Sequence, residues 1–141
     1  RRGDGGGGGV SLRQALKVAG LGPSAMDYVN AHGTSTMADS IELGAVERMM
    51  GEAAAKATMS STKSMTGHGQ GAAGAMEAIF CLLMLDNDFI IPSINVENLA
   101  EGINQGEIAT KSVENAGLDR VMTNSFGFGG TNASVIFGKV D

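Results

Sequence analysis

The two histidines of the chain are the side chains whose types and surroundings point most directly to chemistry. His32 and His68 each lie in a loop rich in glycine, serine and threonine, and each loop follows a segment that we predict to be a strand. A neutral imidazole can donate an N–H to a developing oxyanion, which is worth about 3 kcal/mol per donor. A zinc site is the alternative use of two histidines, but no carboxylate or thiol lies at ligand spacing. The pattern favours catalytic imidazoles.

A lysine and two glutamates are candidates for fixing the charge around these histidines. Lys63 shares a loop with the second histidine, and it is either a solvated surface residue or a buried ammonium that needs a carboxylate partner. Glu42 is our candidate partner, although it also stands three residues after Asp39, as in a helix capping box. Glu77 is the single charge in a long apolar segment, so we expect it to find hydrogen-bond donors or a cation.

Hydroxyl and aromatic side chains in the same loops are further candidates for binding a ligand. Thr34 and Thr36 could hydrogen-bond the polar chain of a ligand, or only the turn itself. Phe126 and Phe128 flank a glycine in a glycine-rich turn. Such aromatic residues more often fill a core, but the glycines would permit one of them to swing as a gate.

Composition limits the class of protein. The chain has 141 residues, 43% of them hydrophobic, a net charge of -5 and no basic run, so we expect one globular domain and no nucleic-acid partner. The single cysteine, Cys81, excludes an internal disulfide, fits a reducing compartment and lies where a small buried side chain is expected, not a nucleophile. No signal peptide is visible, and the longest apolar run, 78–85, is too short to cross a bilayer. We therefore predict a cytoplasmic domain without membrane contact.

Periodicity and turn signals predict the elements that must position these side chains. Helices are expected at 11–19, 39–51 and 70–86. Strands are expected at 26–31, 57–60, 120–125 and 133–139, with an irregular extended segment at 89–96 and a minor strand at 107–112. This order predicts an α/β fold, a mixed β-sheet with helices packed on its faces. The polar loops follow strands, which is where open α/β sheets bind ligands.

The first ten residues contain five consecutive glycines. Ordering them would cost much backbone entropy, so we expect 1–10 to be a flexible Gly-rich end and 11–141 to form the domain. A phosphate cradle is the less favoured alternative, because no lysine and serine or threonine follow as in a P-loop.

Three motifs resemble the β-ketoacyl-[acyl-carrier-protein] synthases, most closely the elongating synthase II and next synthase I. They are N-A-H-G-T-S-T at 30–36, T-K-S-M-T-G-H-G-Q-G-A-A-G at 62–74 and N-S-F-G-F-G-G-T-N at 124–132. The resemblance corresponds to the C-terminal half of enzymes that have a thiolase-like fold of two similar halves. It implies a decarboxylative Claisen condensation in fatty acid elongation. An acyl group rests on a cysteine, malonyl-carrier protein loses CO2, and the resulting carbanion attacks the thioester.

The resemblance also implies a role for each candidate residue in catalysis. His32 and His68 would stabilise the enolate oxygen and assist decarboxylation, and Lys63 would act electrostatically together with Glu42. No cofactor would be required, because the substrate carries phosphopantetheine on acyl carrier protein.

Two further sets of residues acquire roles from the same resemblance. Thr34 and Thr36 would bind the phosphopantetheine arm, and Phe128, with Phe126 beside it, would be the gate between the acyl and malonyl pockets. A structural monovalent cation would be held by Asn30, Glu77, Thr123 and Asn124.

Three departures from the family accompany this resemblance, one of which is the glycine run before Val10. The nucleophilic cysteine belongs to the N-terminal half, and nothing here matches its motif. Residues 37–39 read Met-Ala-Asp, where many relatives have a Pro-x-Gly-Asp turn. We therefore expect the chain alone to be inactive and to need an N-terminal half bearing the cysteine, acyl carrier protein and, when complete, a second copy in a homodimer. A noncatalytic partner subunit and a polyketide-type ketosynthase fragment are the alternatives.

Overall fold

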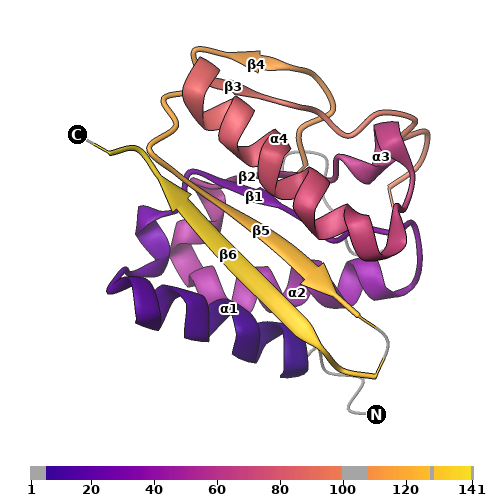
Figure 1. Cartoon of the computed structure of the whole chain (residues 1–141), viewed down its shortest axis with the longest axis horizontal. Helices are drawn as coiled ribbons and strands as arrows, with labels where there is room; N and C mark the ends of the chain where they lie inside the picture. Colours follow the sequence, from indigo (N-terminus) through magenta and orange to yellow (C-terminus); the bar gives the residue numbers. More distant parts are fainter. Residues whose placement is uncertain (1–5, 100–107, 128, 141) are drawn as a thin grey trace.

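A four-stranded mixed sheet in the order β2–β1–β5–β6 forms the centre of the fold (Figure 1). Its strands are β1 (Tyr28–Asn30), β2 (Thr58–Ser60), β5 (Arg120–Phe126) and β6 (Asn132–Gly138). β1 lies parallel to both β2 and β5, whereas β6 pairs antiparallel with β5 at the edge. The computed structural model describes residues 6–99, 108–127 and 129–140.

Helices cover both faces of this sheet (Figure 1). Two pack on one face, α1 (Gly6–Ala19) and α2 (Ala38–Met50), and α4 (Ala73–Asn87) packs on the other. Alternate strand residues reach opposite faces. Val29 and Met122 join the core under α1 and α2, whereas Tyr28 and Val121 join the core under α4. The predicted α/β architecture, a mixed sheet with helices on its faces, is confirmed.

Short elements connect these layers. α3 (Lys63–Thr66) is a single helical turn inside the loop expected after β2. Three 3-10 turns occupy Pro23–Ala25, Gly51–Ala55 and Gln70–Ala72. β3 (Phe89–Ile90) and β4 (Val113–Glu114) form an antiparallel pair. The minor strand expected at 107–112 is instead one isolated bridge from Ile108 to Met59, with β4 just beyond it.

The first helix begins earlier than the sequence predicted. α1 starts at Gly6, so residues 6–10 are helical and not part of a flexible end. A Cβ on Gly8 would lie only 2.9 Å from the Phe126 ring. The glycines cost helix propensity, but their lack of side chains lets α1 approach the end of the sheet, and this packing offsets the cost. Ser11, expected at the helix start, lies inside α1, and its hydroxyl hydrogen-bonds that of Ser134 at 3.1 Å.

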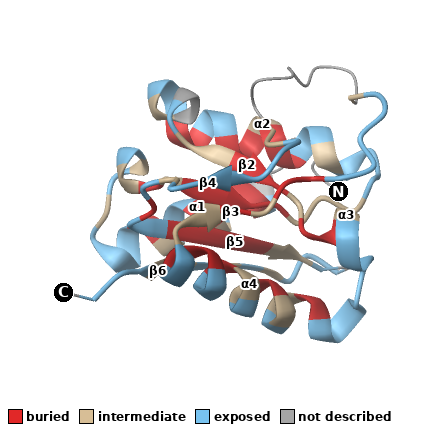
Figure 2. Cartoon of the chain, turned by 90° about the horizontal axis from the view of Figure 1, so that it is seen from above, coloured by how far each residue is buried: buried red, intermediate tan, exposed pale blue. Residues whose placement is uncertain are grey.

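α4 has a buried face and an exposed one, although its sequence is apolar almost all round. Cys81, Met84 and Leu85 are buried against the sheet. Ile79, Leu82 and Leu83 form the opposite, exposed face, with 56%, 47% and 48% of their surface accessible (Figure 2). The helix expected to be buried is therefore half uncovered.

Within the described ranges, we find no helix long and apolar enough to span a membrane.

Candidate active site

The two histidines meet beyond the carboxyl ends of two adjacent parallel strands. β1 and β2 pair with Asn30 opposite Ser60, and each strand leads into one of the histidine loops. The centroids of the His32 and His68 rings lie 5.4 Å apart, and the rings are perpendicular. Parallel pairing therefore brings together two side chains that are 36 positions apart in the sequence.

His32 is held in its neutral form. Burial, followed by the positive charge of Lys63 and by His68, lowers the pKa of His32 to about 4. Its Nδ1 atom is buried and has no hydrogen-bond partner among the described residues. The Phe126 ring lies beside it, with centroids 5.9 Å apart. His68, by contrast, is exposed. A neutral, partly enclosed imidazole next to an accessible one is suited to donate N–H groups to a developing oxyanion.

Glu42 holds the backbone of the His32 loop and does not pair with Lys63. Its Oε1 accepts the His32 N–H at 2.8 Å, and its Oε2 accepts the Gly33 N–H at 3.0 Å. The amide of Asn124 donates to Oε1 at 3.3 Å. Burial raises the pKa of Glu42, and these three hydrogen bonds oppose the rise. The predicted partnership with Lys63 is wrong because both oxygens are already taken by the loop.

Lys63 forms a buried ion pair with Glu77 instead. Lys63 is the first residue of α3, which lies beside the start of α4 (Figure 1), and Glu77 stands in the first turns of α4. Burial raises the pKa of Glu77, and the ammonium of Lys63 opposes this. The sequence predicted a donor or a cation for this isolated carboxylate, and the lysine is that cation.

Two oxygens on the α4 side of the sheet fit the predicted cation site. Glu77 Oε2 and Thr123 Oγ1 are buried without a hydrogen-bond partner among the described residues. The equally unpartnered Asn124 Oδ1 belongs to a side chain on the other face, where Asn124 hydrogen-bonds Glu42 of α2. Asn30 lies opposite Thr123 in the sheet register. Buried oxygens without donors suit a hard cation. These side chains would hold it and orient the strand ends under the histidines; its presence remains a prediction.

Asp39 organises the threonine loop, a role that sequence reasoning missed. Its carboxylate accepts the backbone N–H groups of Thr34 at 3.1 Å, Ser35 at 3.0 Å and Thr36 at 3.3 Å. The capping box predicted for Asp39 and Glu42 is not formed, because both carboxylates accept from the loop before the helix. The sequence signal for this role was the position of Asp39 and Glu42 shortly after the polar loop 32–36.

Thr36 lies at a cleft of about 1080 Å³, whereas Thr34 and the two histidines are not among the residues that line it. Thr36 and Lys63 line it, together with the segment 93–96. Thr34 is tied to Thr36 by a hydroxyl hydrogen bond of 3.1 Å. Phe128, the predicted gate, lies outside the described residues, so its role stays a prediction.

Cys81 is unsuited to nucleophilic catalysis. It is completely buried on α4, and burial raises the pKa of its thiol to about 12. Because the thiolate is the reactive form, this side chain packs and does not react. The predicted inert role of Cys81 agrees with its burial.

A mixed sheet with helices on both faces and paired imidazoles beyond its parallel strands defines a thiolase-like ketosynthase domain. Residues 3–97 match the family described as "Beta-ketoacyl synthase, C-terminal domain", and the chain belongs to this family.

Similar proteins cover most of this chain. It is 55% identical over 127 residues to 3-oxoacyl-[acyl-carrier-protein] synthase 1 of Haemophilus influenzae, which is 89% of this chain and 30% of that protein. It is 48% identical over 125 residues to synthase 2 of Rhizobium meliloti, again 89% of this chain and 30% of that protein. Among solved structures, the chain is similar to one of a type II polyketide synthase (PKS) acyl-carrier protein in complex with its ketosynthase. The TM-score is 0.87 at 28% identity, and the match covers 99% of this chain and 34% of that one. The chain thus spans about a third of the length of its relatives.

Proposed function

We propose that this chain is the C-terminal part of a β-ketoacyl-acyl-carrier-protein synthase that elongates fatty acids. The observation that carries the proposal is the pairing of a neutral His32 with His68 at 5.4 Å between ring centroids. Two imidazole N–H donors at one point suit the enolate oxygen that forms when a malonyl thioester loses CO2. The complete enzyme would be an acyltransferase of the cytoplasm.

The surrounding charges support this chemistry. Burial, and then the Lys63 ammonium, lower the pKa of His32 and keep it unprotonated, so that it donates a hydrogen bond without carrying a charge. Glu77 pairs with this ammonium, and Glu42 accepts hydrogen bonds from the backbone N–H groups of His32 and Gly33. Preorganised donors of this kind need no rearrangement while charge develops.

Acyl carrier protein is the proposed partner that delivers the malonyl group. The arm of its phosphopantetheine is long, narrow and polar along its amides, and the cleft beside Thr36 offers hydroxyl groups along one wall. The solved ketosynthase complex with its acyl-carrier protein supports a partner of this kind.

The acyl group needs a nucleophile from outside this chain. Cys81 is buried and its thiol pKa is about 12, so we propose that an N-terminal half supplies the reactive cysteine. The exposed apolar face of α4, formed by Ile79, Leu82 and Leu83, supports contact with such a half. A homodimer of the complete protein is part of the same proposal.

Elongation of fatty acids is favoured over the alternatives by two observations. Identity to the 3-oxoacyl synthases is 40% to 55%, against 27% to 34% for ketosynthases of polyketide synthases and of complexes with a chain length factor. The complete set of His32, His68 and the Lys63–Glu77 pair argues against a noncatalytic subunit, which would not need it.

The test separates the two half-reactions in the complete synthase. We expect His32→Ala to lower the rate of malonyl decarboxylation about 100-fold, as for loss of one oxyanion donor. Acylation of the cysteine should fall far less. Radiolabelled CO2 release and acyl-enzyme mass measure the two steps, with the exposed Lys17→Ala as control. Equal loss in both steps would count against the proposed role.

A further inference from the structure

The two histidine loops are anchored to opposite faces of the sheet. Glu42, on α2, holds the His32 loop through two backbone N–H groups. Glu77, on α4, holds the second loop through Lys63. Because α2 and α4 pack on different faces (Figure 1), neither anchor sets the separation of His32 and His68.

Ser61 connects these two separately anchored loops. It directly follows β2, and its hydroxyl donates a hydrogen bond of 2.9 Å to the carbonyl oxygen of Gly33. Since Glu42 accepts the Gly33 N–H, that residue is fixed at its amide by α2 and at its carbonyl by Ser61. A second hydrogen bond joins the ends of the two strands: the amide of Asn30, the last residue of β1, donates to Oγ1 of Thr62, just after β2, at 3.2 Å.

The two loops meet in close contact at this point. A Cβ on Gly33 would lie 2.7 Å from Ser61 Cβ and 2.8 Å from its Oγ, and Gly33 has a φ of +30°. Only a residue without a side chain fits this approach. The Gly33 backbone and the Ser61 side chain are therefore in such close contact that a small movement of one loop displaces the other.

The position of Ser61 is itself fixed by further hydrogen bonds. Its N–H donates to Ser93 Oγ at 2.9 Å, and its carbonyl accepts the Ser64 hydroxyl at 2.8 Å. The Ser64 hydroxyl in turn accepts the Ile94 N–H at 2.9 Å. The residues after β3 therefore brace Ser61 against displacement away from Gly33.

We propose that Ser61 is a positioning residue that sets the separation of His32 and His68 through its hydrogen bond to the Gly33 carbonyl. This inference rests on the proposed function, because the paired imidazoles matter only if they share an oxyanion. Ser61 lines the cleft beside Thr36, but its hydroxyl proton is donated to the Gly33 carbonyl, so its role is argued through the loop backbone. Removing its hydroxyl leaves the loops joined only at their bases, through Ala31 N–H to Ser60 O and Asn30 to Thr62, so the distance between the imidazoles is less closely fixed.

The test uses the complete synthase with Ser61→Ala and Ser61→Cys. Cysteine is close to serine in volume and keeps only a weak donor, so it tests the hydrogen bond even if the alanine variant does not fold. We expect kcat for malonyl decarboxylation to fall about tenfold in both variants, since small misplacements of reacting groups are costly. KM for malonyl-acyl carrier protein and the rate of cysteine acylation should stay within about twofold. Ser61→Thr, which restores the hydroxyl, should recover most of kcat.

Ser24→Ala is the control, because Ser24 is an exposed serine in the 3-10 turn Pro23–Ala25 and does not line the cleft. It should leave kcat unchanged. Wild-type rates of decarboxylation in both Ser61→Ala and Ser61→Cys would overturn the positioning role while the synthase assignment stands. A fall in the rate of cysteine acylation as large as the fall in decarboxylation would also overturn the positioning role. No condensation by the unmodified synthase would instead overturn the proposed function, and this inference with it.

Discussion

The surroundings of His32 in the fold, and not the ordinary pKa of histidine, set its protonation state. An ordinary histidine has a pKa near 6.5 and is partly charged at neutral pH. Here burial and the Lys63 ammonium both disfavour a second positive charge, and His68 adds to this. Because its pKa lies near 4, His32 keeps the same neutral form, with one N–H donor, across the whole neutral range of pH.

We predict that His32 titrates near pH 4 and that Lys63→Met raises its pKa toward 6.5. Because the folded pKa lies below the unfolded one, only the unfolded chain takes up this proton between about pH 6.5 and 4. The contribution of His32 therefore lowers the free energy of unfolding as pH falls through that window, and has no effect above it. Titration of the imidazole NMR signals measures the pKa, with the exposed Lys17→Met as control. A wild-type pKa near 6.5 would contradict the burial of this ring.

At the level of elements, the sequence pattern located the four strands of the central sheet and the two histidine loops, whereas the minor strand expected at 107–112 is only an isolated bridge. β1 and β2 lie within the predicted segments 26–31 and 57–60, and parallel pairing follows from the alternating order of strands and helices. α1 was missed at its start because glycine has a low helix propensity; the close contacts of Gly7 with Asn132 and of Gly8 with Phe126 explain why glycines stand there.

The partners of the charged residues could not be predicted from local pattern. Asp39 and Glu42 have capping-box spacing, but both carboxylates accept hydrogen bonds from the loop before α2. Lys63 and Glu77 are 14 residues apart on two helices, and no periodicity relates them. Their pairing depends on how α3 packs beside α4, which is a tertiary property.

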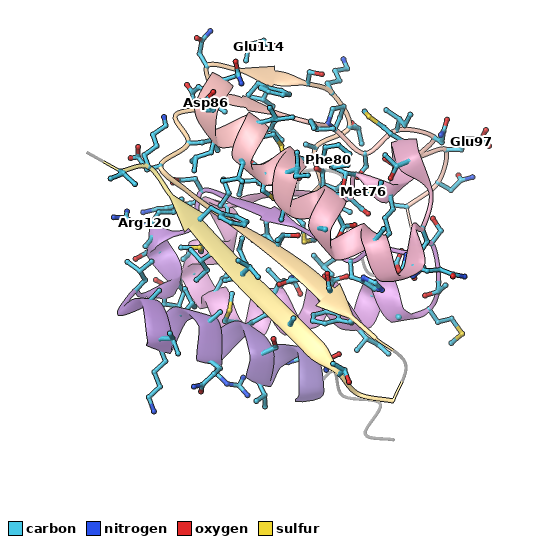
Figure 3. All side chains as sticks on the ribbon, viewed as in Figure 1. Met76, Phe80, Asp86, Glu97, Glu114 and Arg120 are labelled. Carbon is cyan, nitrogen blue, oxygen red and sulfur yellow. The ribbon has the colours of Figure 1, made fainter. Side chains whose placement is uncertain are left out.

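Glu77 ties α4 to α3, and we predict that Glu77→Leu destabilises the protein by about 3 to 5 kcal/mol, because Lys63 is left buried without a partner. The double variant Lys63→Met/Glu77→Leu should recover most of this loss, since an apolar pair often replaces a buried ion pair at little cost. Urea unfolding of the chain measures both. Asp86→Leu removes an exposed acid from the same helix (Figure 3) and should change stability by less than about 0.5 kcal/mol. Unchanged melting of Glu77→Leu would mean that Glu77 is not buried.

The whole molecule presents a site that is open on one side. His68 is exposed, and along α4 the side chains of Ile79, Leu82 and Leu83 face solvent. Apolar side chains gathered on one helix face usually mark an interface. The chain also spans about 30% of the length of its relatives. Both observations are explained if a second half covers α4 and encloses the imidazoles, which would exclude water from the enolate.

We therefore predict that Ile79→Ser/Leu83→Gln weakens contact with the cysteine-bearing half but not the fold of this chain. Each side chain is about half exposed, so covering both would contribute about 1.5 to 3 kcal/mol, or roughly 10- to 100-fold in affinity. The melting temperature of the complete synthase should fall, whereas that of the 141-residue chain should stay nearly constant. Val18→Ser, which changes an exposed apolar residue on α1, should alter neither. If the complete protein carrying Ile79→Ser/Leu83→Gln melts like the wild type, this face of α4 does not contact the other half, and the imidazoles must be enclosed from another direction.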